Sequence, residues 1–180
     1  YAITHLAGRS CSAFIPQLDM ALANGLKLVQ IRENSLTGAA LGEFAATVVA
    51  HCHAGRARVV VNADLELAQA IGADGVHLRS AQLAKLKSRP DFELVGASTH
   101  NARELEQAAR LNCDFAVLGP VLPTDSHPGS QYLGWSAWSR LTADAELPVY
   151  ALGGLHPSDL ETARLHGAHG IAMMRGAWLQ

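Results

Sequence analysis

The chain lacks the features that mark membrane, secreted and nucleic-acid-binding proteins. No apolar run approaches the roughly 20 residues needed to cross a bilayer, and no signal-peptide pattern opens the sequence. Only three cysteines occur in 180 residues, without metal-type spacing, and the formal net charge of -2 comes without a basic cluster. We therefore expect a cytoplasmic protein that has neither nucleic acid nor a membrane as a partner.

Short apolar runs that end in polar or glycine residues recur through the whole sequence. There are eight, at positions 1–4, 28–32, 59–62, 75–78, 94–98, 115–120, 149–154 and 170–175. Segments with helical spacing separate them, which predicts eight strand–helix units and a (β/α)8 TIM barrel. A doubly wound open sheet is the alternative, but polar residues at almost every strand end favour a closed barrel.

The two ends of the sequence suggest that the barrel is trimmed. The sequence starts directly on a strand without Met, and an eighth helix has barely begun at 177–179. Complete barrels of this kind usually have about 200 to 250 residues. We therefore expect residues 1–180 to form a single barrel domain that is part of a longer fusion protein.

Glycines close the last two predicted strands. Leu152-Gly153-Gly154 ends the seventh, and Arg175-Gly176 follows the eighth. In such barrels the loops after these strands commonly bind phosphate through backbone N–H groups, since glycine lets the main chain approach the oxygens. The sequence predicts a small-molecule phosphate ligand here, although the glycines could also serve only a tight turn.

The second predicted strand carries Gln30 and Arg32 on one face, because strand side chains repeat every second residue. A guanidinium at the top of a barrel strand presents a planar fork to phosphate or carboxylate. The alternative for Arg32 is a surface salt bridge with Glu33 or another neighbour.

Polar side chains also end the third, fourth and fifth predicted strands, as Asn62, His77 and Ser98. Each could be a satisfied buried polar group, and for His77 taken alone that is the better interpretation. Their equivalent positions on successive strands favour a lined pocket. On the long segment after the sixth strand, Thr124, Ser126 and His127 form either a ligand clamp or a set of turn residues.

Taken together, these residues resemble the thiamine phosphate synthase and thiazole tautomerase superfamily. The resemblance runs through the whole chain in the motifs Gln30-Ile-Arg32, Val61-Asn62, Gly72-Ala-Asp-Gly-Val-His-Leu78, Gly96-Ala-Ser98-Thr-His-Asn101, Gly119-Pro-Val-Leu-Pro-Thr124, Leu152-Gly-Gly154 and Gly167-Ala-His-Gly-Ile-Ala172. Synthases of this family join a hydroxymethylpyrimidine pyrophosphate to a thiazole phosphate and release pyrophosphate with Mg²⁺.

The resemblance implies a role for each matching residue. Gln30 would face the pyrimidine, and Arg32, Asn62 and Ser98 would face the pyrophosphate. Thr124 and Ser126 would contact the thiazole, and its phosphate would be held by Gly153, Gly154, Arg175 and Gly176. If the barrel is catalytic, Ser98, Arg32 and His127 are the candidate catalytic residues.

The sequence departs from the family at four positions. Asn34 and His127 stand where the family has lysines, and Ala63 and Gln82 stand where it has metal-binding aspartates. Mg²⁺ prefers anionic oxygen ligands, and Asp64 is expected to point to the other side of the strand end. We therefore expect no metal site, and a charge at His127 only when its imidazole is protonated.

Two functional hypotheses follow. The first is an active transferase or tautomerase of thiamine biosynthesis, although the tautomerase histidine would fall at Pro120. The second is a non-catalytic barrel that binds a thiamine-related phosphate. The sequence is most similar to the synthase-like domain fused behind a Nudix hydrolase, which makes such a hydrolase the expected fused partner.

Overall fold

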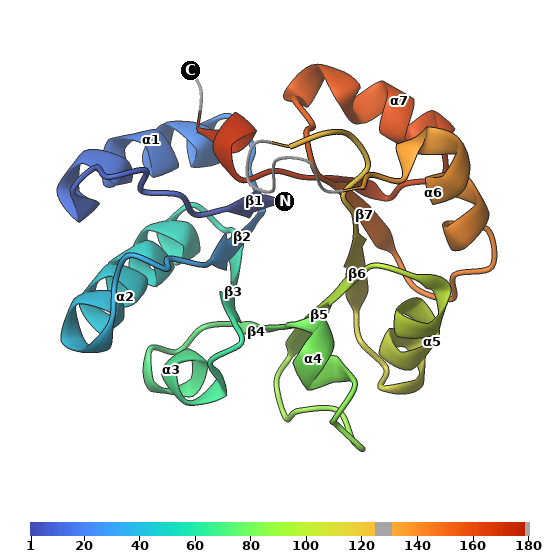
Figure 1. Cartoon of the computed structure of the whole chain (residues 1–180). Coiled ribbons are helices and arrows are strands. Elements are labelled where there is room, and N and C mark those ends of the chain that lie inside the picture. Colours follow the sequence, from blue (N-terminus) through green and yellow to red (C-terminus); the bar gives the residue numbers. More distant parts are fainter. Residues whose placement is uncertain (125–130, 179–180) are drawn as a thin grey trace.

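The computed structural model describes residues 1–124 and 131–178, and eight parallel strands form its centre (Figure 1). The strands are β1 (Ala2–Ile3), β2 (Leu28–Ile31), β3 (Arg58–Asn62), β4 (Gly75–Leu78), β5 (Leu94–Thr99), β6 (Phe115–Leu118), β7 (Val149–Leu152) and β8 (Gly170–Ala172). Each pairs with its neighbour in the sequence, in the order β1 to β8.

The first and last strands meet, which closes the sheet on itself. The Ile3 N–H donates to the Met173 carbonyl at 2.8 Å, and the Met173 N–H donates to the Tyr1 carbonyl at 3.0 Å. The predicted (β/α)8 barrel is therefore confirmed. The open doubly wound sheet is excluded, because its strand order would not follow the sequence.

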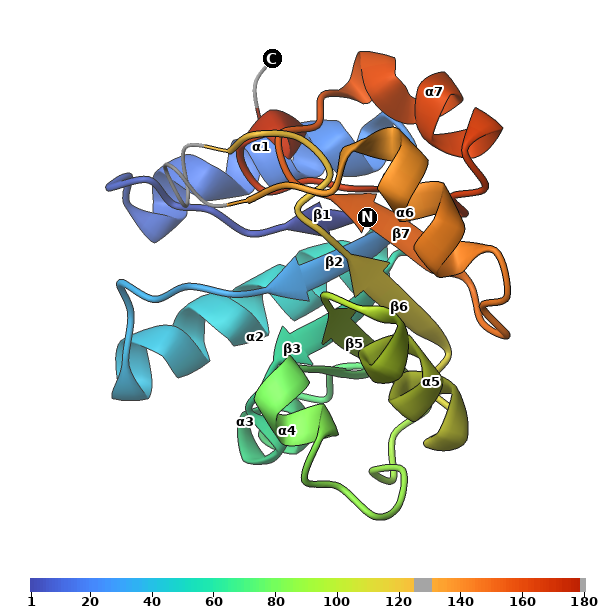
Figure 2. The same cartoon turned by 45° about the vertical axis from the view of Figure 1, so that its right-hand side comes forward.

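Helices surround the barrel on the outside (Figures 1 and 2). They are α1 (Cys11–Ala23), α2 (Gly38–Ala54), α3 (Leu65–Ala70), α4 (Ser80–Leu83), α5 (Ala102–Arg110), α6 (Gly134–Thr142) and α7 (Leu160–Leu165), with 3₁₀ turns η1 (Pro157–Asp159) and η2 (Arg175–Ala177). None of the helices in the described ranges is long and apolar enough to cross a bilayer.

Local capping explains where several helices begin. The Asn101 side chain accepts from the Glu104 N–H at 3.0 Å and caps α5. The helix α4 begins at Ser80, where the Gln82 side chain accepts from the Arg79 N–H at 3.1 Å. Pro157 starts the 3₁₀ turn η1 before α7.

Strand alternation separates two apolar layers. One face of each strand packs outward against the helices, where Val59 and Val61 of β3 are fully or almost fully buried. The other face fills the barrel interior, where the Tyr1 and Phe115 rings lie 5.3 Å apart and the Phe115 and Tyr150 rings 5.7 Å apart. The interior is therefore a packed core.

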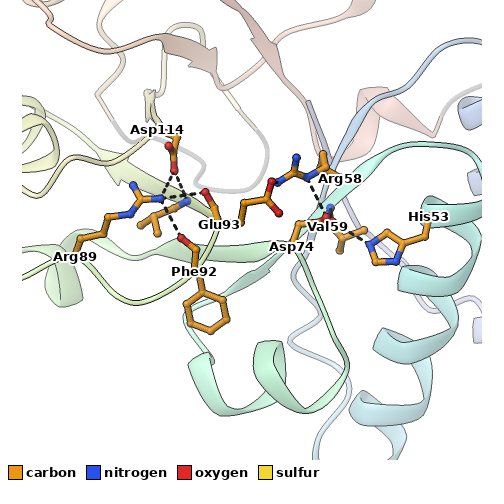
Figure 3. Close-up of polar contacts among 9 residues, drawn as sticks. His53, Arg58, Val59, Asp74, Arg89, Phe92, Glu93 and Asp114 are labelled. Atoms are coloured by element: carbon orange, nitrogen blue, oxygen red, sulfur yellow. Dashed lines mark hydrogen bonds and ion pairs between the residues drawn. The ribbon is translucent and has the colours of Figure 1, made fainter.

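Carboxylates hold the amino-terminal ends of the strands (Figure 3). Asp74 accepts from the Val59 N–H at 2.7 Å and pairs with Arg58 at 2.9 Å and His53 at 3.0 Å. Asp114, just before β6, plays the same part for β5 and accepts from the Val95 N–H at 2.7 Å. This end of the barrel serves stability, which leaves the opposite end for ligands.

Replacing Asp74 with alanine should destabilise the protein by about 2 kcal/mol, because a strand N–H loses its acceptor in a largely buried setting. Urea unfolding of Asp74→Ala gives the loss directly. The matched control is Asp91→Ala, an exposed side chain without a hydrogen bond or ion pair among the described residues. Equal stability of the two variants would contradict the assigned role of Asp74.

Candidate active site at the carboxyl ends of the strands

A chain of four polar side chains crosses the interior of the barrel. Gln30 Nε2 donates to the Tyr1 hydroxyl at 2.5 Å, and that hydroxyl lies 3.0 Å from His77 Nδ1. His77 Nε2 lies 2.9 Å from the Ser98 hydroxyl. Gln30 and His77 are buried, whereas Ser98 is half-buried. The chain therefore runs from the closed interior towards the open mouth.

Burial decides the charge of His77. Desolvation by burial, together with a smaller effect of the nearby Arg32 guanidinium, lowers the pKa of His77 to about 3. Burial likewise raises the pKa of the Tyr1 hydroxyl far above its ordinary value. Both groups are therefore neutral near pH 7. A direct contact of Gln30 or His77 with a ligand stays a prediction.

A cavity of about 460 Å³ opens at the rim beside β2 and β3. Its floor is apolar, and its polar lining residues are Arg32, Glu33, Asn34, Asn62, Asp64, Glu66 and Arg79. The sequence predicted Arg32 and Asn62 from their positions at strand ends, and the fold brings both to this cavity. Arg79 was not predicted, because nothing in its local pattern sets it apart from a solvent-exposed arginine.

Arg32 faces across the mouth towards the end of β8. Its Nη1 lies 3.6 Å from the Met174 sulfur, and its backbone N–H donates to the Thr4 hydroxyl at 2.9 Å. Among the described residues Arg32 forms no ion pair, and the Glu33 carboxylate instead accepts from the Leu6 N–H at 3.1 Å. The alternative of an Arg32–Glu33 salt bridge is therefore wrong.

Arginines and carboxylates share this part of the rim, since the cavity is lined by Arg32 and Arg79 and by Glu33, Asp64 and Glu66. Desolvation is the largest cause of the lowered pKa of His5, and the Arg175, Arg9 and Arg32 guanidiniums lower it further, against the opposing effect of Glu33. Arg32 and Arg175 thus both act on one half-buried side chain. The arginines predicted from the second and eighth strands therefore both lie close enough to His5 to lower its pKa, although carboxylates line the same rim.

The glycine-ended loops after β7 and β8 lie against each other. A Cβ on Gly176 would be 3.0 Å from the Leu155 carbonyl oxygen, one residue beyond Gly154. Gly153 and Gly154 adopt φ of +108° and +66°. Their N–H groups donate to no backbone acceptor in the described part of the chain. Successive free N–H groups of this kind form an anion-binding concavity.

Two of the predicted residues, Ser126 and His127, lie outside the described residues. Thr124 is described and half-buried just before them. Sequence reasoning missed Tyr1, which links Gln30 to His77. No local pattern could reveal it, because Tyr1 and His77 are brought together by the closing of the barrel.

Comparison with known proteins decides the family. A family model described as thiamine monophosphate synthase matches residues 1–177. The chain belongs to this family. The thiamine-phosphate synthase of Chlorobium phaeobacteroides is 30% identical over 94% of this chain and 84% of its own length. That of Gloeobacter violaceus is 34% identical over 88% of this chain and 47% of its own.

A solved structure confirms the fold of the thiamine monophosphate synthase family for this chain. The thiamine phosphate pyrophosphorylase of Pyrococcus furiosus superposes with a TM-score of 0.80 at 22% identity, covering 97% of this chain and 84% of that one. At this identity the likeness shows the barrel alone. The function depends on the residues at the carboxyl ends of the strands.

The Mg²⁺ that the family resemblance implies does not suit the residues present. Ala63 offers no side-chain oxygen, and both ends of the Gln82 amide are used: Nε2 donates to the Ala63 carbonyl at 2.8 Å and Oε1 accepts from Arg79. The expectation that Asp64 points to the other side of the strand end is wrong, because Asp64 lines the cavity together with Arg32 and Asn62. Its carboxylate caps α3 by accepting from the Leu67 N–H at 2.9 Å. No cluster of three or more metal-binding side chains occurs within residues 1–124 and 131–178.

Proposed function

We propose that this barrel binds a thiazole phosphate, or a related phosphate of the thiamine pathway, without Mg²⁺-dependent synthase catalysis. The N–H groups of Gly153 and Gly154, which have no backbone acceptor among the described residues, are the observation that carries the proposal, and the next residue in their loop, Leu155, lies beside Gly176. Arg32 and Arg175 add positive charge at the same mouth. Phosphate oxygens accept hydrogen bonds from backbone N–H groups and pair with guanidiniums.

The alternative function is an active thiamine phosphate synthase. It is supported by the family match and by relatives that carry this name. It is disfavoured by the side chains at positions 34, 63 and 82, which supply neither the lysine nor the carboxylates. A fused Nudix hydrolase stays a prediction from the resemblance, because the comparisons support the synthase family alone.

The phosphate group should dominate binding. We expect thiazole phosphate to bind at least about a hundredfold more tightly than the unphosphorylated thiazole alcohol, because charge-assisted hydrogen bonds contribute about 1.5–3 kcal/mol each. Calorimetric titration of both compounds gives the ratio. Equal affinities would overturn the proposed phosphate site.

Gly154→Ala should weaken thiazole phosphate binding about tenfold or more. A Cβ there would lie 2.3 Å from the Pro123 carbonyl oxygen at a φ that favours glycine, so the loop must shift. The control is Gly42→Ala in α2, where a Cβ meets nothing within 4 Å. The control should bind like the unchanged protein, and an equal loss in both variants would remove the glycine loop from the site.

A further inference from the structure

The hydrogen atoms of the interior polar chain can be assigned from its partners. The Tyr1 hydroxyl has two, Gln30 Nε2 and His77 Nδ1. An amide NH₂ can only donate, so the Tyr1 oxygen accepts from Gln30. The hydroxyl hydrogen of Tyr1 has no other acceptor among the described residues, and a buried hydroxyl without an acceptor is costly, so His77 Nδ1 accepts it.

The assignment continues through His77 to Ser98. A neutral imidazole carries one N–H, and with Nδ1 accepting, that hydrogen lies on Nε2. His77 Nε2 therefore donates to the Ser98 oxygen 2.9 Å away. The hydrogen of Ser98 has no acceptor among the described residues, and this half-buried side chain stands next to the carboxyl end of β5.

Packing holds the chain in this arrangement. The Tyr1 ring lies edge-on to Phe115 at 5.3 Å and 5.6 Å from the Tyr150 ring. A side chain at position 96 would bring its Cβ to 2.8 Å from His77 Nδ1, so glycine is what leaves room for the imidazole. The donor–acceptor order is therefore built into the folded barrel before any ligand arrives.

We propose that Gln30, Tyr1 and His77 are positioning residues that fix the Ser98 hydroxyl as a hydrogen-bond donor to an oxyanion at the barrel mouth. The inference rests on the proposed phosphate-binding function and adds to it one side-chain donor, the Ser98 hydroxyl. The direction of the His77–Ser98 hydrogen bond also distinguishes Ser98 from an activated serine nucleophile. In a nucleophile–base pair the serine hydroxyl donates to the imidazole, which is the reverse order.

Nitrogen-15 NMR of the His77 ring tests the direction of its two hydrogen bonds without any ligand. We expect a protonated Nε2 and an unprotonated Nδ1 at pH 7. Tyr1→Phe keeps the ring packing, removes the donor to Nδ1 and should shift His77 towards the other tautomer. Tyr150→Phe is the matched control, because its hydroxyl forms no hydrogen bond among the described residues. A protonated Nδ1 in the unchanged protein overturns the proposal.

Titration with inorganic pyrophosphate tests whether the Ser98 hydroxyl donates a hydrogen bond to an oxyanion. Ser98→Ala should weaken its binding about tenfold, the worth of one such hydrogen bond. Tyr1→Phe should weaken it severalfold, and the double variant should lose no more than Ser98→Ala alone, since Tyr1 acts only through Ser98. Tyr150→Phe should bind normally.

The outcomes separate this inference from the proposed function. Pyrophosphate affinity that is equal in all four variants, with thiazole phosphate still bound, overturns the oxyanion contact and leaves the glycine-loop site standing. Additive losses in the double variant overturn the positioning role of Tyr1. Failure of the unchanged protein to bind thiazole phosphate while it binds pyrophosphate overturns the proposed thiazole phosphate site alone.

Discussion

With the two substrates of the family and saturating Mg²⁺, this chain should release pyrophosphate about a thousandfold more slowly than a synthase that has the aspartates. A metal ion that neutralises a leaving group typically contributes several kcal/mol to the transition state. Here Ala63 has no side-chain oxygen to bind a metal ion. Both ends of the Gln82 amide already form hydrogen bonds, with the Ala63 carbonyl and the Arg79 N–H. The rate is measured by coupled detection of pyrophosphate, with the Chlorobium phaeobacteroides synthase as the positive control.

A variant that restores the two aspartates tests the absence of a metal site from the opposite direction. Ala63→Asp combined with Gln82→Asp should create measurable Mg²⁺ binding by calorimetry, whether or not turnover appears. The backbone favours the first change, because residue 63 has φ of +65°, which aspartate tolerates better than alanine. Mg²⁺-dependent turnover by the unchanged chain at a rate close to that of the control would contradict this account.

Stability should fall as the pH drops from 7 to 4.5, and His77 alone should contribute about 2.5 kcal/mol of that loss. Burial lowers the folded-state pKa of His77 to about 3, against about 6.5 in the unfolded chain. The unfolded state therefore takes up the proton first. The contribution is fully present above the unfolded pKa and is lost progressively as the pH falls towards 3.

Urea unfolding at pH 7 and pH 4.5 isolates the His77 contribution from that of other groups. His77→Gln should show a pH-dependent loss smaller by about 2.5 kcal/mol than that of the unchanged protein. Ser98→Ala is the control, because it removes a partner of His77 but keeps the imidazole. The same pH dependence in all three proteins would show that His77 is not buried in its neutral form.

The barrel could be predicted from the sequence because parallel strands buried on both faces read as continuous apolar runs. Val59-Val60-Val61 is the clearest example, and it forms the buried middle of β3. Short helices were harder to predict. The one at Ser80–Leu83 begins where the Gln82 side chain caps the Arg79 N–H, a contact that the apolar pattern does not record.

The part of the site that could be predicted is the part that the order of the strands determines. Arg32 and Asn62 reach one cavity because they follow neighbouring strands, and the Gly154 and Gly176 loops meet for the same reason. Tyr1 could not be assigned from the sequence, because its role depends on an interior contact with His77 across 76 positions. The burial of His77 agrees with the interpretation favoured for that residue taken alone, but its partners Tyr1 and Ser98 depend on interior packing that strand periodicity does not specify.

Calorimetric titration of the chain with thiazole phosphate, first in EDTA and then in excess Mg²⁺, tests the central claim most directly. Binding through Gly153, Gly154 and the rim arginines needs no metal ion. The account therefore predicts saturable binding with the same dissociation constant in both buffers. Absence of binding, or binding only when Mg²⁺ is present, would contradict it.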